Sequence, residues 1–428
     1  MKSELSKAIS ESVINNTRSF MENNEFSKNW HFYLISCLII ISFYSFGNFG
    51  FWNIFGIKFE VNIFLVLFLI PISIFLFFLN WRNILSNPWV VLIFYLLISS
   101  LLMDTSNYTQ SIKLLFALSL VTILLSMDFK YINFIIKSII IISFLFSIIG
   151  ILLFIYYQLN PDLLIGLDRV FRSYDTYTDL THIPLHQKFG FVIETAEKNI
   201  FGLEYIRSRS YVSEPSATVH IFFASAILSL LYSKNIKKMG IVIFFFGIVL
   251  IYSGSVILSL VFSIFYAIGK AFINLGEKRE SIIIIIIAII SAYLMIYFID
   301  ISMLQVITPE SKSTSLSSRL LPIVDYLDKI LDNIFHKKDL EIGSFVGILL
   351  IFSGVVPILG MLLTGYMIYV FLNMSIKVYE QQKLFSILIV GLLIQISLFS
   401  SGGWVTIGGL LMLTLIYIKL QNEVKDIE

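Results

Sequence analysis

The sequence predicts an all-α polytopic membrane protein with about 12 transmembrane helices and two long external loops that contain short surface helices. Two observations predict this class. Of the 428 residues, 57% are hydrophobic and only 14% are charged, which is not the composition of an ordinary soluble domain. Apolar runs of roughly 20 residues, the length of helix that crosses a bilayer core of about 30 Å, recur along nearly the whole chain.

These runs divide the chain into seven parts. A polar N-terminal segment, 1–30, precedes helices one to five in 31–158, and the first long loop occupies 159–214. Helices six to nine follow in 215–300, the second long loop in 301–343, helices ten to twelve in 344–420, and a tail in 421–428. The predicted helices are 31–47, 61–80, 88–103, 111–127, 136–158, 215–232, 238–252, 254–273, 281–300, 354–373, 384–400 and 403–420.

Basic residues predict the orientation of these helices. Most Lys and Arg outside the two long loops fall in the termini and in alternate short connections, at Arg82, Lys130 and Lys238 for example. The short connections on the opposite side contain only Lys58 and Lys113. Because basic residues gather on the cytoplasmic side, both termini are predicted to be cytoplasmic and both long loops external.

The predicted helices contain almost no ionisable residue at mid-span. Lys113, Lys137, Lys270 and Asp300 all fall near helix ends, and Gln395 is the most polar residue deep in the late helices. A proton-coupled transporter needs buried carboxylates or histidines, so this class is disfavoured. The single cysteine, Cys37, excludes a disulfide and a thiolate metal site.

The first loop carries the strongest candidate site. It runs into the string Arg-Ser-Arg-Ser-Tyr-Val-Ser-Glu-Pro-Ser, which contains Arg207, Arg209, Ser210, Tyr211 and Ser216. Arg172 lies earlier in the same loop. Guanidinium groups bind phosphate oxygens through paired hydrogen bonds, and the alternative is ordinary charge on a solvated loop. An extended backbone would place Arg207 and Arg209 on one side, whereas a helix would place them on nearly opposite sides.

Glu214 is the candidate with the most specific chemistry. It precedes Pro215, a residue suited to the first turn of a helix, so Glu214 is expected at the N-terminal edge of the sixth helix. The helix dipole there favours the carboxylate and makes it a weak base. The sequence therefore leaves two roles open, a helix cap and an acceptor of a proton.

The second loop supplies a further cation. Arg319 follows a stretch rich in serine and precedes apolar residues at helical spacing from Leu320 to Ile334, which predict an amphipathic helix on the membrane surface. Arg319 at its N-terminus would complete an anion site, unless it is simply a basic residue before a surface helix. His336 is either a titratable group facing the same site or an exposed loop residue.

The residues resemble a known family. Two long external loops, the Arg-x-x-Ser-x-x-x-Glu-Pro-Ser motif from Arg207 to Ser216, and the Ser-Ser-Arg motif ending at Arg319 resemble the O-antigen polymerases of the Wzy family. The resemblance implies an enzyme in the bacterial inner membrane that joins undecaprenyl-diphosphate-linked oligosaccharides, which serve as both donor and acceptor. It implies glycosyl transfer without a metal or other cofactor, and with no nucleic-acid partner.

The resemblance also implies roles for individual residues. Arg207, Arg209 and Arg319 would stabilise the charge that grows on the departing diphosphate. Glu214 would accept the acceptor proton or orient an arginine. A flippase and a chain-length regulator are the expected protein partners.

Two alternatives remain open. An O-antigen ligase shares the topology and transfers the finished glycan to the lipid A core, but a His-rich element is expected there and only His336 is available. A lipid-linked oligosaccharide flippase or transporter is the alternative from another class, and it would place polar and charged groups along a central cavity.

Overall fold

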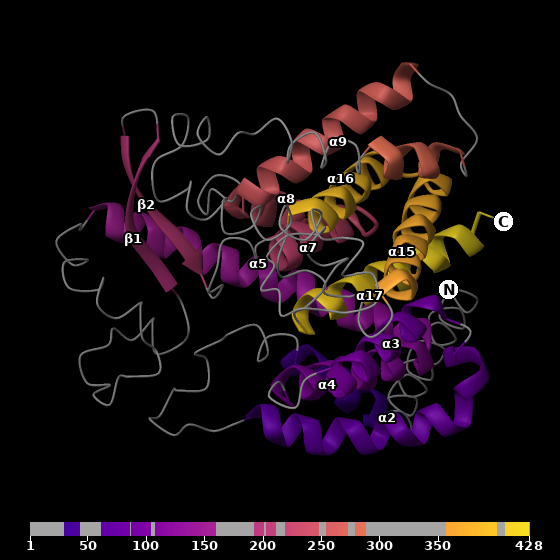
Figure 1. Ribbon diagram of the computed structural model, residues 1–428. Coiled ribbons are helices and arrows are strands. Elements are labelled where there is room, and N and C mark those ends of the chain that lie inside the picture. The colour runs from indigo at the N-terminus through magenta and orange to yellow at the C-terminus, as the bar shows by residue number, and fades with distance from the viewer. Residues whose placement is uncertain are drawn as a thin grey trace, which may run out of the picture.

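A computed structural model describes the chain in segments. These are residues 30–42, 61–85, 87–103, 108–159, 192–200, 203–210, 219–247, 254–272, 279–287, 357–399 and 407–427. Within these segments the protein is mainly helical (Figure 1). Each of the twelve predicted spans overlaps a helical segment of the described chain, several of them only in part, and their crossing of a membrane stays a prediction.

The helices follow in chain order. The first is Trp30–Ser42. It is followed by α2 (Val61–Leu85), α3 (Pro88–Met103), α4 (Tyr108–Ser126), α5 (Phe129–Leu159), the π-helical turn η5 (Val219–Phe223), α7 (Ala224–Ser229), α8 (Lys234–Phe245) and α9 (Gly254–Phe272). A helical segment at 279–287 precedes α15 (Pro357–Lys377), α16 (Lys383–Phe399) and α17 (Ile407–Lys425).

Helix boundaries differ from the predicted ones where the sequence turns polar. The predicted second span ends at residue 80, and α2 does bend there, because Asn80 has φ −125° and ψ 19°, but the helix continues to Leu85. α5 begins at Phe129 and not at 136, and α17 continues to Lys425. Backbone hydrogen bonds therefore extend these helices into the polar residues that flank their apolar stretches.

The first long loop adds one small hairpin to an otherwise helical fold. Its described part contains two strands, β1 (Val192–Ile200) and β2 (Leu203–Ser210), which pair antiparallel, where the sequence predicted short surface helices. Two residues connect the strands, and one of them is Gly202, a residue type typical of tight hairpins. Residues 301–343, where the amphipathic helix of the second loop is predicted, lie outside the described residues.

The outer surface of the helices is unusually apolar. α5 contains the stretch Phe129–Tyr156, which is long and apolar enough to cross a membrane, and seven shorter apolar stretches of 10–17 residues occur elsewhere in the described chain. Only 28% of the most apolar part of this stretch is buried, whereas the core helix of a soluble protein is mostly buried. These features support membrane association.

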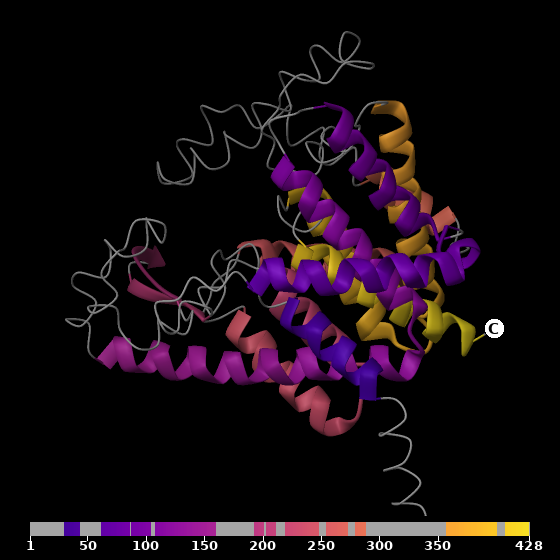
Figure 2. The same ribbon diagram turned by 90° about the horizontal axis from the view of Figure 1, so that it is seen from below.

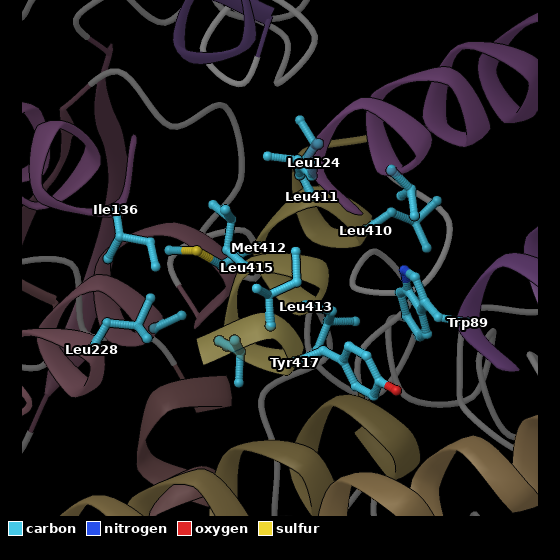
Figure 3. Packing of buried hydrophobic residues seen from close by; sticks show 14 of the residues in the cluster. Trp89, Leu124, Ile136, Leu228, Leu410, Leu411, Met412, Leu413, Leu415 and Tyr417 are labelled. Atoms are coloured by element: carbon cyan, nitrogen blue, oxygen red, sulfur yellow. The ribbon is translucent and has the colours of Figure 1, made fainter. Parts of the chain in front are cut away.

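α17 is the central helix of the core. Its residues from 409 to 420 are all buried, and Figure 3 shows its side chains surrounded by Trp89, Leu124, Ile136 and Leu228 from four other helices. The Trp89 indole donates a hydrogen bond of 2.7 Å to the Thr414 hydroxyl, which anchors α3 to α17. An apolar core with a satisfied indole N–H fixes the positions of the surrounding helices.

Glycine allows two helix pairs to approach closely. A Cβ placed on Gly391 of α16 would lie 2.0 Å from Ser263 Oγ and 2.3 Å from the Ser259 carbonyl oxygen, both on α9. A Cβ on Gly240 of α8 would lie 1.8 Å from Ser229 Oγ. Small residues at such contacts are typical of helices that pack in membranes.

Candidate functional site

The structure describes the backbone of three predicted site residues, Arg207, Arg209 and Ser210, all on β2. The other six lie outside the described residues. They are Arg172, Tyr211, Glu214, Ser216, Arg319 and His336. The pairing of Arg207 with Arg319, and the choice between capping and proton transfer for Glu214, therefore stay predictions.

The backbone of β2 is extended through the Arg-Ser-Arg-Ser sequence. Arg207 is paired in the strand register with Glu194 of β1, and Ser208 with Ile193. The register then passes to Val192 and Ser210, so Arg209 falls at an irregularity of the pairing. An extended backbone favours a shared side of the strand for Arg207 and Arg209, and β2 is extended. The irregularity in the pairing, however, interrupts the regular alternation of side-chain direction between these two residues.

The hairpin lies at one end of the helical bundle. β2 packs against α5, and Figures 1 and 2 show the hairpin beside one end of this long helix, with the C-terminus at the opposite side of the molecule. After the Arg-to-Ser string the chain re-enters the bundle at η5, a π-helical turn that contacts α7, α8, α9 and α17. π-helical turns are rare and are frequent at functional sites.

A first cluster of charged and aromatic side chains joins α5, the α7–α8 connection and α17. Lys419 Nζ lies 5.0 Å from the centre of the Phe129 ring and 5.2 Å from that of Tyr232, and it pairs with Glu423 at 2.9 Å. The Tyr232 hydroxyl donates to Asn133 Oδ1 at 2.8 Å. The cation is thus held between two aromatic faces, which tie three segments together.

A second cluster joins α9, the segment 279–287 and the α15–α16 connection. Lys270 forms a buried ion pair with Glu280, and the Tyr266 hydroxyl donates to the other carboxylate oxygen at 2.8 Å. Lys270 Nζ also lies 5.3 Å from the centre of the Tyr379 ring. The carboxylate is therefore matched by a cation and a neutral donor, which offsets the cost of burying it.

These clusters connect helix ends that the sequence predicts to be cytoplasmic. The ends of α9 and α15 meet through Lys270 and Tyr379, and the start of α5 meets the second half of α17 through Phe129 and Lys419. The start of the first helix joins them, since the Phe32 and Tyr131 rings stack with centres 5.0 Å apart. The contacts bring these helix ends together, while the membrane crossings and the side that the ends face stay predictions.

Sequence reasoning missed Glu280. The signal was present, because Glu280 follows Arg279 and directly precedes a run of isoleucines that begins after Ser281. A carboxylate at the edge of such a run needs a cation within reach, and Lys270 is ten residues earlier, across a short connection. Lys270 could have been suggested from the sequence as the partner of Glu280. The participation of Tyr266 and Tyr379 could not, because it depends on tertiary packing.

Gln395 is buried without a matching group. Its exposed fraction is 0%, and neither its amide oxygen nor its amide nitrogen has a hydrogen-bond partner in the part of the chain that the structure describes. The Thr364 hydroxyl oxygen and Asn373 Oδ1 are also buried atoms without a hydrogen-bond partner there. Most buried polar groups in proteins are paired, so each of these exceptions requires a physical explanation.

Known proteins add no assignment for this arrangement. Comparisons with protein-family models, curated proteins and solved structures found no match to the chain. Among the described residues no group of three or more His, Cys, Asp or Glu side chains could hold a metal ion. The metal-independent mechanism therefore stays a prediction of the sequence.

Proposed function

We propose that this chain is a polysaccharide polymerase of the bacterial inner membrane, which joins undecaprenyl-diphosphate-linked oligosaccharide repeat units on the outer face of that membrane. The proposal includes the twelve-span topology, with both termini cytoplasmic and both long loops external. Its substrates act as donor and acceptor, and a flippase and a chain-length regulator are its proposed partners.

The observation that carries the proposal is the position of Arg207. It lies on an extended strand paired with β1, and this hairpin packs against α5, the helix with the membrane-length apolar stretch. A cation held on ordered backbone beside a membrane-length helix is suited to a diphosphate that is attached to a membrane-embedded chain. A paired strand restricts the backbone more than an unstructured loop does, which favours preorganised charge stabilisation.

The bundle supports a membrane-embedded enzyme in two further ways. Large apolar side chains cover the outside of α2, where Phe75, Phe78 and Leu67 are 65%, 73% and 66% exposed. Such a surface is costly in water and favourable in lipid. The two charged residues that pair inside the bundle, Lys270 near the end of α9 and Lys419 in the second half of α17, each have a carboxylate partner.

The proposed chemistry is an inverting glycosyl transfer. The bond between the anomeric carbon of the donor sugar and the diphosphate oxygen breaks, and a bond from that carbon to an acceptor hydroxyl oxygen forms. Arg207, Arg209 and Arg319 stabilise the diphosphate anion that leaves. Glu214 takes the proton of the acceptor hydroxyl or orients one of these arginines. Arg172, Ser210, Tyr211, Ser216 and His336 are proposed to contact the substrate.

The location of charge favours this enzyme over a transporter. A transporter that couples to ions is expected to carry charged groups along the middle of its helices. In the described part of the bundle, the buried pair of Lys270 and Glu280 lies where α9 ends and the segment 279–287 begins. Buried polar side chains elsewhere in the described bundle include the uncharged Gln395 and Thr364, and the buried Lys419 is neutralised by Glu423.

Deletion and complementation test the function. Loss of a polymerase leaves single repeat units on the lipid A core, loss of a ligase leaves none, and loss of a flippase leaves repeat units on the cytoplasmic side of the membrane. Restoration of a ladder of long chains by the wild-type gene would support the proposal. A deletion strain that retains the ladder, or one that lacks even the single-repeat band, would contradict it.

A further inference from the structure

The strongest unexplained surface feature of the described bundle is a group of exposed lysines shared by α5 and α8. Lys137 is exposed near the start of α5, and Lys234, Lys237 and Lys238 are exposed in the first two turns of α8. Among the described residues, none of these four ammonium groups forms an ion pair, whereas that of Lys419 does. We call the four residues the lysine patch, and its positive charge is available to an anionic partner.

Contacts between α5 and the α7–α8 connection bring the four lysines together. The Tyr232 hydroxyl, just before α8, donates to Asn133 Oδ1 at 2.8 Å, and Lys137 Nζ lies 5.6 Å from the centre of the Tyr232 ring. The hydroxyls of Ser143 and Ser225 are hydrogen-bonded at 3.2 Å, so α7 is antiparallel to α5. α7 leads through a short turn into α8, which returns alongside α5 and packs against it. α5 and α8 therefore begin at the same level and run in the same direction.

Beyond the lysine patch the exposed face of both helices becomes apolar. Large apolar side chains follow the lysines at helical spacing, so they lie on the same exposed stripe of each helix. They are Ile241 and Phe245 on α8, and Ile141, Leu145 and Leu152 on α5. Because the two helices begin at one level and run in the same direction, the change from basic to apolar comes at about the same level on both. One boundary between a charged and an apolar surface therefore crosses the two helices.

Aromatic side chains of the first helix lie near the same boundary. The Tyr33 ring lies 5.3 Å from the Tyr131 ring and 5.4 Å from the Phe134 ring, centre to centre, and both partners are near the start of α5. Trp30, one turn before Tyr33, is exposed. Trp and Tyr are enriched where helices pass from water into lipid, and lysines there lay their stems along apolar surface with the ammonium group in water. These three helix starts have the composition typical of a membrane–water interface.

The apolar stripe decides between two kinds of anionic partner. An acidic protein would match the charge of the lysine patch, but its acidic surface would not match the apolar side chains beyond it. A phospholipid combines an anionic phosphate with apolar acyl chains in one molecule. From Ile141 to Leu152 the stripe on α5 is about 17 Å long, close to the depth of one leaflet of a bilayer core of about 30 Å. An acyl chain can therefore lie along the stripe while the phosphate of the same molecule meets the lysines.

We propose that the lysine patch and the apolar stripes beyond it form a binding site for phospholipids with a net negative headgroup. The ammonium groups donate to the phosphate oxygens, and the acyl chains lie along the exposed stripes of α5 and α8. The proposal rests on the membrane placement that belongs to the proposed function. It requires neither polymer formation nor a particular leaflet.

The test measures which lipid lies beside the patch. Cys37, the only cysteine, is replaced by alanine, and Ile241→Cys or Ile141→Cys then carries a bimane fluorophore just beyond the lysines. The full chain is reconstituted in nanodiscs of phosphatidylcholine. These nanodiscs contain increasing fractions of either phosphatidylglycerol or phosphatidylcholine with a nitroxide on the acyl chain, which quenches a fluorophore close to it. The ratio of the two quenching curves reports the local preference for the anionic lipid.

Two double variants remove the same charge from different places. Lys237→Gln with Lys238→Gln changes the patch, and Lys383→Gln with Arg82→Gln changes exposed positions on α16 and α2. With the patch intact, and in the control, half-maximal quenching should need about fivefold less phosphatidylglycerol than phosphatidylcholine, because one lysine near an anionic surface contributes about this factor. In the patch variant the preference should fall below about twofold at both probes. Salt should weaken the preference, since exposed charges are screened.

Equal quenching by the two lipids with the patch intact would overturn the proposal and leave an acidic protein as the partner of the lysines. A preference that persists unchanged in the patch variant would also overturn it. Quenching by neither lipid would place these faces outside the bilayer and would contradict the proposed topology as well. The polymerase is tested separately, because quenching requires no polymer formation. A lysine-dependent preference stands even if the wild-type gene fails to restore long chains, and equal quenching leaves a restored ladder unaffected.

Discussion

Lys270 near the end of α9 and Glu280 in the segment 279–287 form an ion pair whose side chains are only 12% and 8% exposed. The Tyr266 hydroxyl supplies a second hydrogen bond to the carboxylate, and the Tyr379 ring lies beside the ammonium group. The ion pair joins α9 to the segment 279–287. Through Tyr379 it also contacts the turn between α15 and α16. Both side chains of the pair are largely buried, so its disruption tests the packing directly.

Lys270→Met is expected to lower the free energy of unfolding by about 3 kcal/mol, because it leaves the Glu280 carboxylate buried without its cation. The double variant Lys270→Met, Glu280→Gln should recover most of this loss, since it removes both charges. Thermal unfolding in nanodiscs measures both effects. Lys383→Met, at an exposed position, is the control and should change stability by less than about 0.5 kcal/mol. Equal losses for Lys270→Met and Lys383→Met would contradict the buried pair.

Gly391→Ala tests the close contact of α16 with α9. The added Cβ would lie 2.3 Å from the Ser259 carbonyl oxygen, a backbone atom, so the helices must separate. We expect a loss of about 2 kcal/mol, in the range for overpacked cores. Gly365→Ala on α15 has no atom within 4 Å of the new Cβ, and it should stabilise the helix by up to about 1 kcal/mol. If both variants melt alike, the helix contact is wrong.

Lys419→Met tests the contact between the start of α5 and α17. It removes the cation from the Phe129 and Tyr232 rings and leaves Glu423 without its partner, so we expect a loss of about 1–2 kcal/mol. Lys425→Met, on the same helix but exposed, should have no measurable effect. The measurement is again unfolding in nanodiscs, and the contact would be refuted by a Lys419 variant as stable as the Lys425 variant.

The single cysteine makes the topology testable. Cys37 is the only cysteine of the chain, so Cys37→Ala provides a background without thiols. In that background, Lys198→Cys on the hairpin should react with a membrane-impermeant maleimide added to spheroplasts. Lys238→Cys, in the second turn of α8, should react only after the membrane is permeabilised. The reverse pattern of labelling would invert the proposed orientation.

The positions of the helices could be predicted from the sequence because the apolar runs are long and their flanks are polar. The bend at Asn80 and the central burial of α17 depend on tertiary packing, so the runs alone did not indicate them. The hairpin was missed although β2 contains Tyr205 and Ile206, residue types that favour strands, because the short polar stretch was interpreted as loop. A two-residue connection containing Gly202 was the available signal.

The candidate site was predictable only in part. The sequence indicated the Arg-to-Ser string as the candidate site. The structure describes an extended backbone for the first four residues of the string, from Arg207 to Ser210. It could not indicate that Arg207 is paired with Glu194, because strand register depends on both strands and on their irregularities. Gln395 was noticed for its polarity, but its lack of partners depends on how α9 and α16 pack.

The most direct test of the central claim is polymer formation in vitro by wild type and Arg207→Lys. Both proteins are reconstituted in liposomes with lipid-linked repeat units, and chain length is followed over time. Lysine keeps the charge but loses the paired hydrogen bonds to a diphosphate. We predict a rate about 100-fold lower, the size of effect seen when one group that stabilises developing charge is removed. Arg82→Lys, at the end of α2, should polymerise at the wild-type rate. An Arg207→Lys enzyme as fast as wild type would contradict the claim that Arg207 on the hairpin stabilises the departing diphosphate.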